Sequence, residues 1–231
     1  MKVCVLIIAT NKYLRFVERL WSDIETYFLP GHQVSGLLFT DTDGNVPARI
    51  RRAQTPHEPW PMTTLKRYHY FLRERTYIAE FDACYYIDAD MAIVDAVGDE
   101  VLGDFVATMH PYQSFCPKEQ RSYDRNPDSS AYVPFGEEAE HYYAGGFHGG
   151  TPPQFLAMCE VIRQWIDDDL QRGVMAAWHD ESYLNRYAID HPPAVVLSPS
   201  YCFSEEHLNH PRYPHRPKIV ALQKDHHDLR S

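Results

Sequence analysis

The stretch "YYIDADMAIVD", residues 85–95, places two aspartates where an apolar run ends. Asp88 and Asp90 are separated by one residue, so their side chains would point the same way in an extended chain. An unpaired carboxylate inside a strand is unfavourable, because burial penalises its charged form. The pair therefore lies either in solvent at the end of a strand or beside a positive group.

Strands and helices are predicted to alternate on both sides of this stretch. Residues 83–88 form the apolar run that ends at the acidic pair, and residues 2–10, "KVCVLIIAT", are typical of a central strand covered on both faces. Further strands are predicted at 32–40, 48–54 and 104–110. Helices are predicted at 14–28, 64–80 and 152–173, with another helix start within 178–187. The alternation implies an α/β fold, with a mostly parallel central sheet and helices on both faces.

Length and composition indicate a single globular domain over residues 1–231. The hydrophobic content of 44% is ordinary for a globular protein and argues against disorder. Residues 111–140 are rich in Pro, Ser, Gln and Glu without a period, so they are predicted to form a long loop of a functional or mobile kind. The tail, about residues 207–231, is rich in His, Pro, Lys and Arg, and we expect it to end in mobile segments.

Charge and cysteine usage limit the classes of protein that fit. The formal net charge of −10 argues against a nucleic-acid binder, which needs a basic face. The five cysteines are scattered without a C-x-x-C pair, a pattern typical of free thiols in a reducing compartment. The apolar start is too short to span a bilayer, and no cleavage pattern follows it. We therefore expect a cytoplasmic protein without a membrane span.

The acidic pair has a structural and a functional interpretation. In the structural interpretation it is a solvated turn with two aspartates. The functional one follows from position, because open α/β sheets bind ligands at the carboxyl ends of central strands. Carboxylate oxygens suit Mg²⁺ or Mn²⁺, which keep open positions for water and phosphate. A nucleotide-diphosphate sugar, bridged to the aspartates by a metal ion, is the natural ligand of such a site.

Three other stretches carry a similar pair of interpretations. "HYYAGGFHGG", 141–150, has glycines that let a backbone approach a ligand, or it is a simple β-turn region. "WHDESYLNRY", 178–187, places acids in a site, or it is an acidic helix start. "TNKYLRF", 10–16, offers Tyr13 to stack on a base, or it is an ordinary helix entry.

Taken together, these motifs resemble glycosyltransferase family 6. The resemblance runs from about Thr10 to the tail and includes "NKY", "GHQVSGLLFTD", "DADM", "HP", "AYVP", "YYAGGFHGG", "WHDESYLNRY" and "VLSPSY", in that order. The family contains the histo-blood-group A and B transferases, α-1,3-galactosyltransferase and shorter bacterial and viral relatives. Membership implies the A-type glycosyltransferase (GT-A) fold. It also implies retaining α-1,3 transfer of Gal or GalNAc from a UDP-sugar to the 3-hydroxyl of a β-galactoside, with Mn²⁺ as cofactor and Mg²⁺ as the alternative.

The resemblance also implies a role for individual residues. Asp88 and Asp90 would hold the metal, and Glu181 would lie below the reacting anomeric carbon. The other residues that match donor-contact positions are Ala9, Thr10, Tyr13, Trp60, Arg67, Ala144, Gly145, Gly146, His179, Asp180, Lys224 and Arg230. The acceptor would be contacted by Glu181 together with His110, Ser122 and Trp178. Lys224 and Arg230 belong to a tail that would fold over the diphosphate.

Mechanism and donor follow from the same match. Glu181 would either form a covalent glycosyl intermediate or stabilise an oxocarbenium-like state while UDP helps to deprotonate the acceptor, since retention permits both. In this family, the residues matching Ala144 and Gly146 flank the 2-substituent of the donor sugar. Gly146 leaves room for an acetamido group, so UDP-GalNAc is expected in preference to UDP-Gal. Ala144 is smaller than its counterpart in the blood-group enzymes and leaves UDP-GlcNAc and UDP-Glc open.

Departures from the family pattern refine these expectations. Some bacterial members carry Asn-x-Asn and need no metal, whereas the Asp-x-Asp here implies metal dependence. The membrane anchor of vertebrate members is missing, so we expect a soluble enzyme acting on a soluble or lipid-linked glycan, with peripheral membrane contact left open. Phe203 and Ser204 replace Trp-Asp of the blood-group enzymes, so a fucosylated acceptor is not implied. A UDP-sugar hydrolase and a non-catalytic glycan- or nucleotide-binding relative are the alternatives from other classes.

Overall fold

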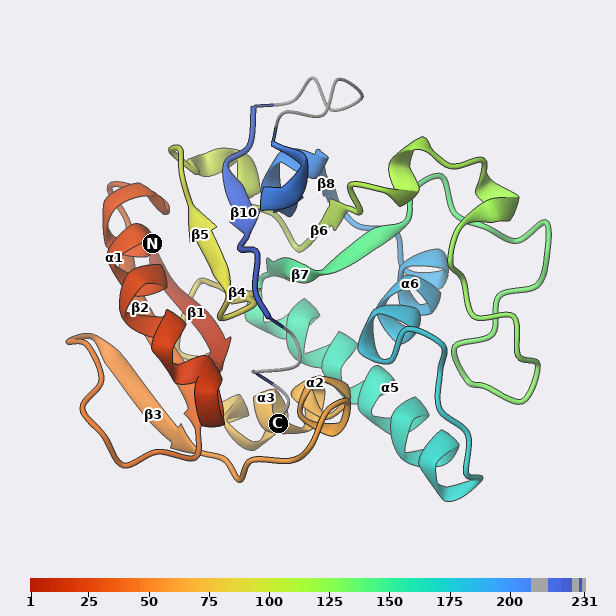
Figure 1. Cartoon of the computed structure of the whole chain (residues 1–231), viewed down its shortest axis with the longest axis horizontal. Helices are drawn as coiled ribbons and strands as arrows, with labels where there is room; N and C mark the ends of the chain where they lie inside the picture. Colours follow the sequence, from red (N-terminus) through yellow and green to blue (C-terminus); the bar gives the residue numbers. More distant parts are fainter. Residues whose placement is uncertain (209–215, 226–228, 230–231) are drawn as a thin grey trace.

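The fold is built around one central sheet of seven strands, shown in a computed structural model that describes residues 1–208, 216–225 and 229. The strands are β1 (Lys2–Ile8), β2 (Gln33–Thr40), β3 (Ile50–Gln54), β4 (Ala83–Ile87), β6 (Phe105–Met109), β7 (Tyr143–Gly150) and β8 (Val195–Leu197). Their order across the sheet is β3-β2-β1-β4-β7-β6-β8 (Figure 1). The first four are mutually parallel, β7 is antiparallel to both neighbours, and β8 is parallel to β6. The predicted α/β fold class is confirmed, with β7 as the exception to a parallel sheet.

Helices cover both faces of this sheet. On one face, α1 (Val17–Tyr27), which follows the 3-10 helix η1 (Asn11–Phe16), packs Leu20 and Trp21 against β1 residues such as Val5. On the other face lie α5 (Pro152–Gln171), α6 (Asp180–Asp190) and α3 (Arg67–Arg73). The apolar spacing that predicted these helices is therefore the spacing of their buried faces. Short 3-10 helices complete the described chain: η2 (Asp99–Val101), η3 (Gln113–Phe115), η4 (Lys118–Gln120), η5 (Pro199–Tyr201) and η6 (Glu205–His207).

The single helix predicted over 64–80 is instead three short ones. They are α2 (Met62–Leu65), α3 and α4 (Arg75–Ile78). The junction residues Lys66 and Glu74 have ψ angles of 11° and 18°, outside the α-helical range. The turn at Lys66 directly precedes Arg67, whose side chain reaches the site described below.

The glycine-rich stretch is a strand and not a β-turn region, so the simpler interpretation of residues 141–150 is wrong. All eight residues of β7 are buried between β4 and β6. A Cβ on Gly149 would lie 2.3 Å from the carbonyl oxygen of Cys84, and one on Gly150 would lie 2.1 Å from that of Asp104. Glycine is required there because the neighbouring backbones approach too closely for any side chain.

Part of the tail forms a strand beside the acidic pair. A second sheet contains β5 (Met91–Ile93), β10 (Ile219–Ala221) and β9 (Phe203–Ser204), in the order β5-β10-β9. Figure 1 shows β10, in blue, beside the yellow β5. The Leu222 amide donates to the carbonyl oxygen of Asp90 at 2.9 Å. The sheet thus connects the tail to the backbone of the acidic motif, while mobility of the rest of the tail stays a prediction.

Residues 111–140 run along the side of the molecule next to α6, in green in Figure 1. Within this segment the structure shows η3, η4 and a bridge between Asp124 and Tyr132. In the part of the chain that the structure describes, no helix has the length and apolar character needed to cross a membrane.

Candidate active site

Two cavities open at the carboxyl ends of β1 and β4. The first has a volume of about 250 Å³ and lies between the residues after β1, the segment 57–64 and the tail. Its lining includes Thr10, Tyr13, His57, Glu58, Trp60, Thr64, Arg67, Tyr86, Asp88, Asp90, Lys224 and Leu229. The second has a volume of about 290 Å³ and is lined by Thr64, Arg67, Asp88, His110, Gly145, Gly146, Trp178, Asp180 and Glu181. The two cavities share Thr64, Arg67 and Asp88, so one elongated ligand could occupy both.

Each carboxylate of the acidic pair has a basic side chain beside it. Arg67 Nη2 lies 3.6 Å from Asp88 Oδ1, which also accepts a hydrogen bond from the Tyr86 hydroxyl. Lys224 Nζ contacts Asp90 Oδ2, and the Asp90 side chain is almost fully buried. The pair therefore lies beside positive groups and not in a solvated turn, as the buried setting requires.

Arg67 is the charged centre of the site. The residue is only 3% exposed, and its Nη1 lies 3.2 Å from Asp180 Oδ2 and donates to the carbonyl oxygen of Gly145 at 2.9 Å. Burial alone would lower the pKa of Arg67, but Asp180 in particular raises it above its usual range. The guanidinium also lies 4.3 Å from the ring centroid of Tyr86. A fixed positive charge is thereby held where the two cavities meet.

Asp180 and Glu181 begin α6 and face the second cavity. Burial raises the pKa of each carboxyl to about 7, and the negative charge of Asp88 adds to both shifts. The Gly145 amide donates to Glu181 Oε2 at 2.9 Å and partly offsets the shift of Glu181. His110 Nε2 lies 4.0 Å from Glu181 Oε1, and burial lowers the pKa of His110 to about 4. At neutral pH the site thus contains a neutral imidazole beside a carboxyl that titrates near neutrality.

The backbone is strained immediately before these acids. His179, at the N-cap of α6, has φ 51° and ψ −126°, a region that residues other than glycine rarely occupy. Its ring packs edge-on against Trp60, with 5.0 Å between centroids. The strained turn directs Asp180 and Glu181 toward Arg67 and β7.

Most of the predicted site residues come together here. Thr10, Tyr13, Trp60, Asp90 and Lys224 line the first cavity. His110, Gly145, Gly146, Trp178, Asp180 and Glu181 line the second, and Arg67 and Asp88 line both. Their individual roles stay predictions.

Five predicted residues lie outside the cavity walls or outside the described chain. Ala9 and Ala144 are buried and line neither cavity. Ser122 lies in the segment 111–140, where its hydroxyl accepts a hydrogen bond from Gln113 at 2.8 Å. His179 packs on Trp60, and Arg230 lies outside the described residues.

Gly145 and Gly146 contact protein atoms closely. A Cβ on Gly145 would lie 3.0 Å from Asp180 Oδ2. A Cβ on Gly146 would lie 2.4 Å from Met91 Cε and 3.0 Å from Asp88 Oδ2. A Cβ at position 146 would therefore have to displace the end of the Met91 side chain and would crowd Asp88, so packing around the acidic motif favours glycine there.

Several residues of the site were not predicted from the sequence. His57 accompanies Thr10, with 2.9 Å between His57 Nδ1 and Thr10 Oγ1, and no sequence signal marks it. Tyr86 precedes Asp88 by two residues on the same strand face, so period-two spacing could have identified it. Asn185 lies one helical turn after Glu181, and its amide bonds both backbone groups of Tyr143 at 2.8 Å.

The acidic pair fits a hard divalent cation. Its donors are carboxylate oxygens at one edge of a cavity, as Mg²⁺ and Mn²⁺ prefer. Among the described residues, no group of three or more His, Cys, Asp or Glu side chains could hold a metal. The pair would therefore have to share such an ion with water and with ligand oxygens.

Comparison with known proteins identifies the family. The profile of glycosyltransferase family 6 matches residues 1–231. Histo-blood group ABO system transferase 1 of Rattus norvegicus is 32% identical over 97% of this chain and 67% of its own length. Globoside alpha-1,3-N-acetylgalactosaminyltransferase 1 of Gallus gallus is 33% identical over 93% of this chain and 64% of its own length. O-antigen biosynthesis glycosyltransferase WbnI of Escherichia coli is 24% identical, with 90% of each chain covered. The chain thus spans about two thirds of the length of the first two relatives, and it belongs to glycosyltransferase family 6 as a transferase that takes a UDP-sugar donor.

Proposed function

We propose that this enzyme transfers GalNAc from UDP-GalNAc to the 3-hydroxyl of a β-galactoside with retention of configuration, in a metal-dependent reaction. The observation that carries the proposal is the junction of the two cavities at Arg67 and Asp88. A nucleotide in the first cavity would have its diphosphate at the acidic pair and its sugar in the second cavity, beside Glu181.

The first cavity suits the nucleoside diphosphate. Tyr13 and the paired Thr10 and His57 offer one aromatic face and hydrogen-bonding groups to the uridine. Asp88 and Asp90 would hold Mn²⁺, or Mg²⁺, which supplies positive charge to the leaving diphosphate when bound. Lys224 now contacts Asp90, and from this position its ammonium can reach a diphosphate in the same cavity.

The second cavity suits the sugar and the acceptor. Departure of UDP leaves positive character on the anomeric carbon, which the Glu181 carboxylate stabilises or captures covalently. The Gly145 amide holds Glu181 Oε2 in place, and Asn185 holds the backbone of the same strand. His110 and Trp178 line the same cavity next to Glu181 and are placed to contact the acceptor.

The donor sugar is inferred from two observations. Gly146 lines the second cavity with its backbone alone, and it matches the family position that flanks the 2-substituent of the donor sugar. The relative from Gallus gallus is named as an N-acetylgalactosaminyltransferase. UDP-Gal, UDP-GlcNAc and UDP-Glc are the donors to test against it, because an open pocket discriminates weakly between sugars.

The test is UDP release from these four donors, in Mn²⁺ or EDTA, with and without lactose and 2′-fucosyllactose. If UDP is released from UDP-GalNAc only with Mn²⁺, and faster with an acceptor, the proposed donor, the proposed metal and the transfer reaction are all supported. UDP release at the same rate with and without an acceptor would indicate a UDP-sugar hydrolase. Release that EDTA leaves unchanged would remove the metal from the proposal.

The cysteines support a reducing compartment such as the cytoplasm. All five are free thiols, and Cys4, Cys84 and Cys159 are buried in the core. Burial raises the pKa of these thiols, which keeps them protonated and unreactive. Cell fractionation with an antibody to the chain tests the location.

A further inference from the structure

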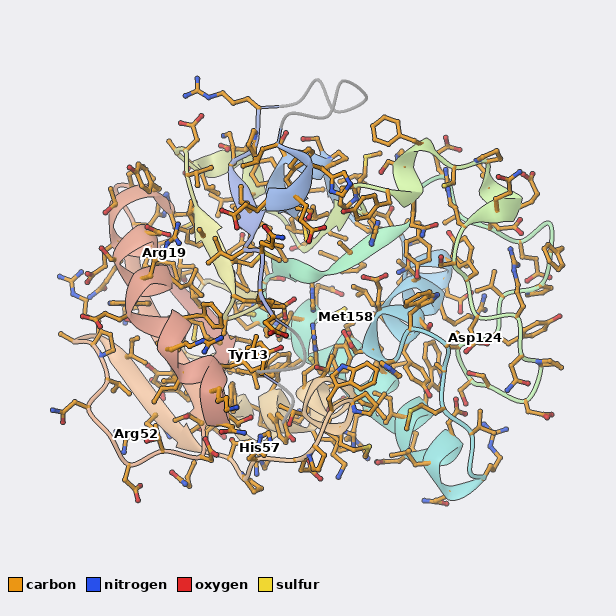
Figure 2. The ribbon with its side chains drawn as sticks, viewed as in Figure 1. Tyr13, Arg19, Arg52, His57, Asp124 and Met158 are labelled. Atoms are coloured by element: carbon orange, nitrogen blue, oxygen red, sulfur yellow. The ribbon has the colours of Figure 1, made fainter. Side chains whose placement is uncertain are left out.

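Two buried aspartates fasten one side of the second cavity to the rest of the molecule. Asp124 lies within the segment 121–133, here called the side loop, and Figure 2 shows it next to α6, away from Tyr13 and His57. Asp124 Oδ2 accepts the amide of Ala177 at 3.0 Å, and Oδ1 accepts the amide of Asn126 at 2.8 Å. The residue is 3% exposed, so its carboxylate is largely shielded from water.

Asp169 provides the second attachment, from the last turn of α5. This residue is fully buried, and its carboxylate accepts hydrogen bonds from Ser129 Oγ at 3.1 Å and from Ser130 N and Oγ at 2.9 and 2.6 Å. It also accepts the hydroxyl of Tyr183 at 2.7 Å and contacts Arg172. The side loop is therefore tied to α5 and α6 through one carboxylate, whose negative charge strengthens each bond.

Asp169 holds the side loop and Tyr183, and Asp124 on that loop bonds the residue directly before Trp178. Its side chain lines the second cavity and is 56% exposed. Its amide donates to Ser182 Oγ at 3.0 Å, and the amide of the preceding Ala177 donates to Asp124. The backbone of Trp178 is thus fixed from both sides, by α6 and by the side loop.

We propose that Asp124 and Asp169 are positioning residues for acceptor recognition, because they hold Trp178 in the wall of the second cavity before any ligand binds. The inference rests on the proposed function, in which this wall faces the acceptor. A wall whose backbone is already fixed has less conformational freedom to lose on binding, so preorganisation favours the acceptor complex. Neither aspartate is among the described residues that line the first cavity, so binding of the nucleoside diphosphate there should be unaffected.

The experiment compares Asp124→Asn and Asp169→Asn with the matched controls Asp128→Asn and Asp168→Asn. Asp128 is exposed in the same loop, and the side chain of Asp168 accepts a hydrogen bond from Gln164, one turn earlier on α5. The expected result for both test variants is an acceptor KM raised about tenfold, while donor KM and acceptor-independent UDP release stay within about twofold. Both controls should resemble the wild type.

Further readouts separate positioning from folding. Hydrogen exchange of the Ala177 and Trp178 amides should speed up in Asp124→Asn, and this readout needs no activity. Tyr183→Phe removes one donor to Asp169 without a buried change of charge, so it should raise acceptor KM by a smaller factor. It replaces Asp169→Asn if that variant is too unstable to assay. Equal losses toward donor and acceptor, or an unchanged acceptor KM despite faster exchange, would overturn the inference. A wild type that releases no UDP from any donor would instead refute the proposed function.

Discussion

Replacing Glu181 by glutamine is expected to stabilise the folded protein above neutral pH while removing transfer activity. Burial raises the pKa of Glu181 from 4.5 to about 7, so the ionised form is disfavoured in the fold. Glutamine has nearly the same shape and never ionises. Its side-chain oxygen can still accept the Gly145 amide that Glu181 accepts at 2.9 Å.

The sign and size of the effect follow from linkage. Between pH 4.5 and about 7 the folded state binds more protons at Glu181 than the unfolded state, so the free energy of unfolding falls as pH rises through this window. The full penalty is present above pH 7 and absent below pH 4. The pKa change corresponds to roughly 3 kcal/mol, which solvent screening of the 23% exposed side chain reduces to about 1–2 kcal/mol.

Urea unfolding of metal-free protein in EDTA at pH 4.5 and pH 8 measures this difference. Glu181→Gln should exceed the wild type by about 1–2 kcal/mol at pH 8 and match it at pH 4.5. Glu25→Gln, on the exposed face of α1, is the control and should change neither value. The reasoning would be refuted if the difference in unfolding free energy between Glu181→Gln and the wild type were the same at pH 8 as at pH 4.5.

Three further predictions concern the junction of the cavities. Arg67→Met should cost about 3–5 kcal/mol of unfolding free energy in urea, because it leaves Asp88 and Asp180 without their buried partner. Gly146→Ala should lower UDP release from every donor alike, since the added methyl meets Met91 and Asp88, whereas a shift in donor preference alone would contradict this account. Mn²⁺ at about 100 times its Kd should raise the unfolding free energy by about 2.7 kcal/mol, and EDTA should reverse this gain. Thermal shift should show a higher melting temperature with Mn²⁺ for the wild type but not for Asp88→Asn.

Much of the fold follows from apolar periodicity, and the failures have physical causes. Residues 2–10 and 152–173 were predicted correctly because their apolar spacing matches one element over its whole length. The strand β7 was missed because glycines carry no side chain and so leave no alternating pattern. The breaks at Lys66 and Glu74 have no signal, since neither residue disfavours a helix.

The candidate site was predicted where its residues follow strand ends, and missed where distant segments meet. Asp88 directly follows β4 in the sequence, whereas the contact of Asp124 with Ala177 joins segments that the sequence separates by 53 residues. Asp169 did leave a signal. It continues the buried stripe of Ile162 and Ile166 at helical spacing, so an acid at this position had to be buried. A buried acid needs several donors, and the side loop supplies them.

The charges at the junction of the two cavities couple the protonation of Glu181 to the binding of a cation at the acidic pair. Four carboxylates surround two basic side chains there, and the groups are Asp88, Asp90, Asp180, Glu181, Arg67 and Lys224. Full ionisation would leave an excess of negative charge in a poorly solvated space. Burial is the main cause of the raised pKa values of Asp180 and Glu181, and the charge of Asp88 adds to both. A divalent cation at the acidic pair would offset it and lower both pKa values. With a cation held by Asp88 and Asp90, Glu181 would be ionised at neutral pH, which is the form that can stabilise or capture the anomeric carbon.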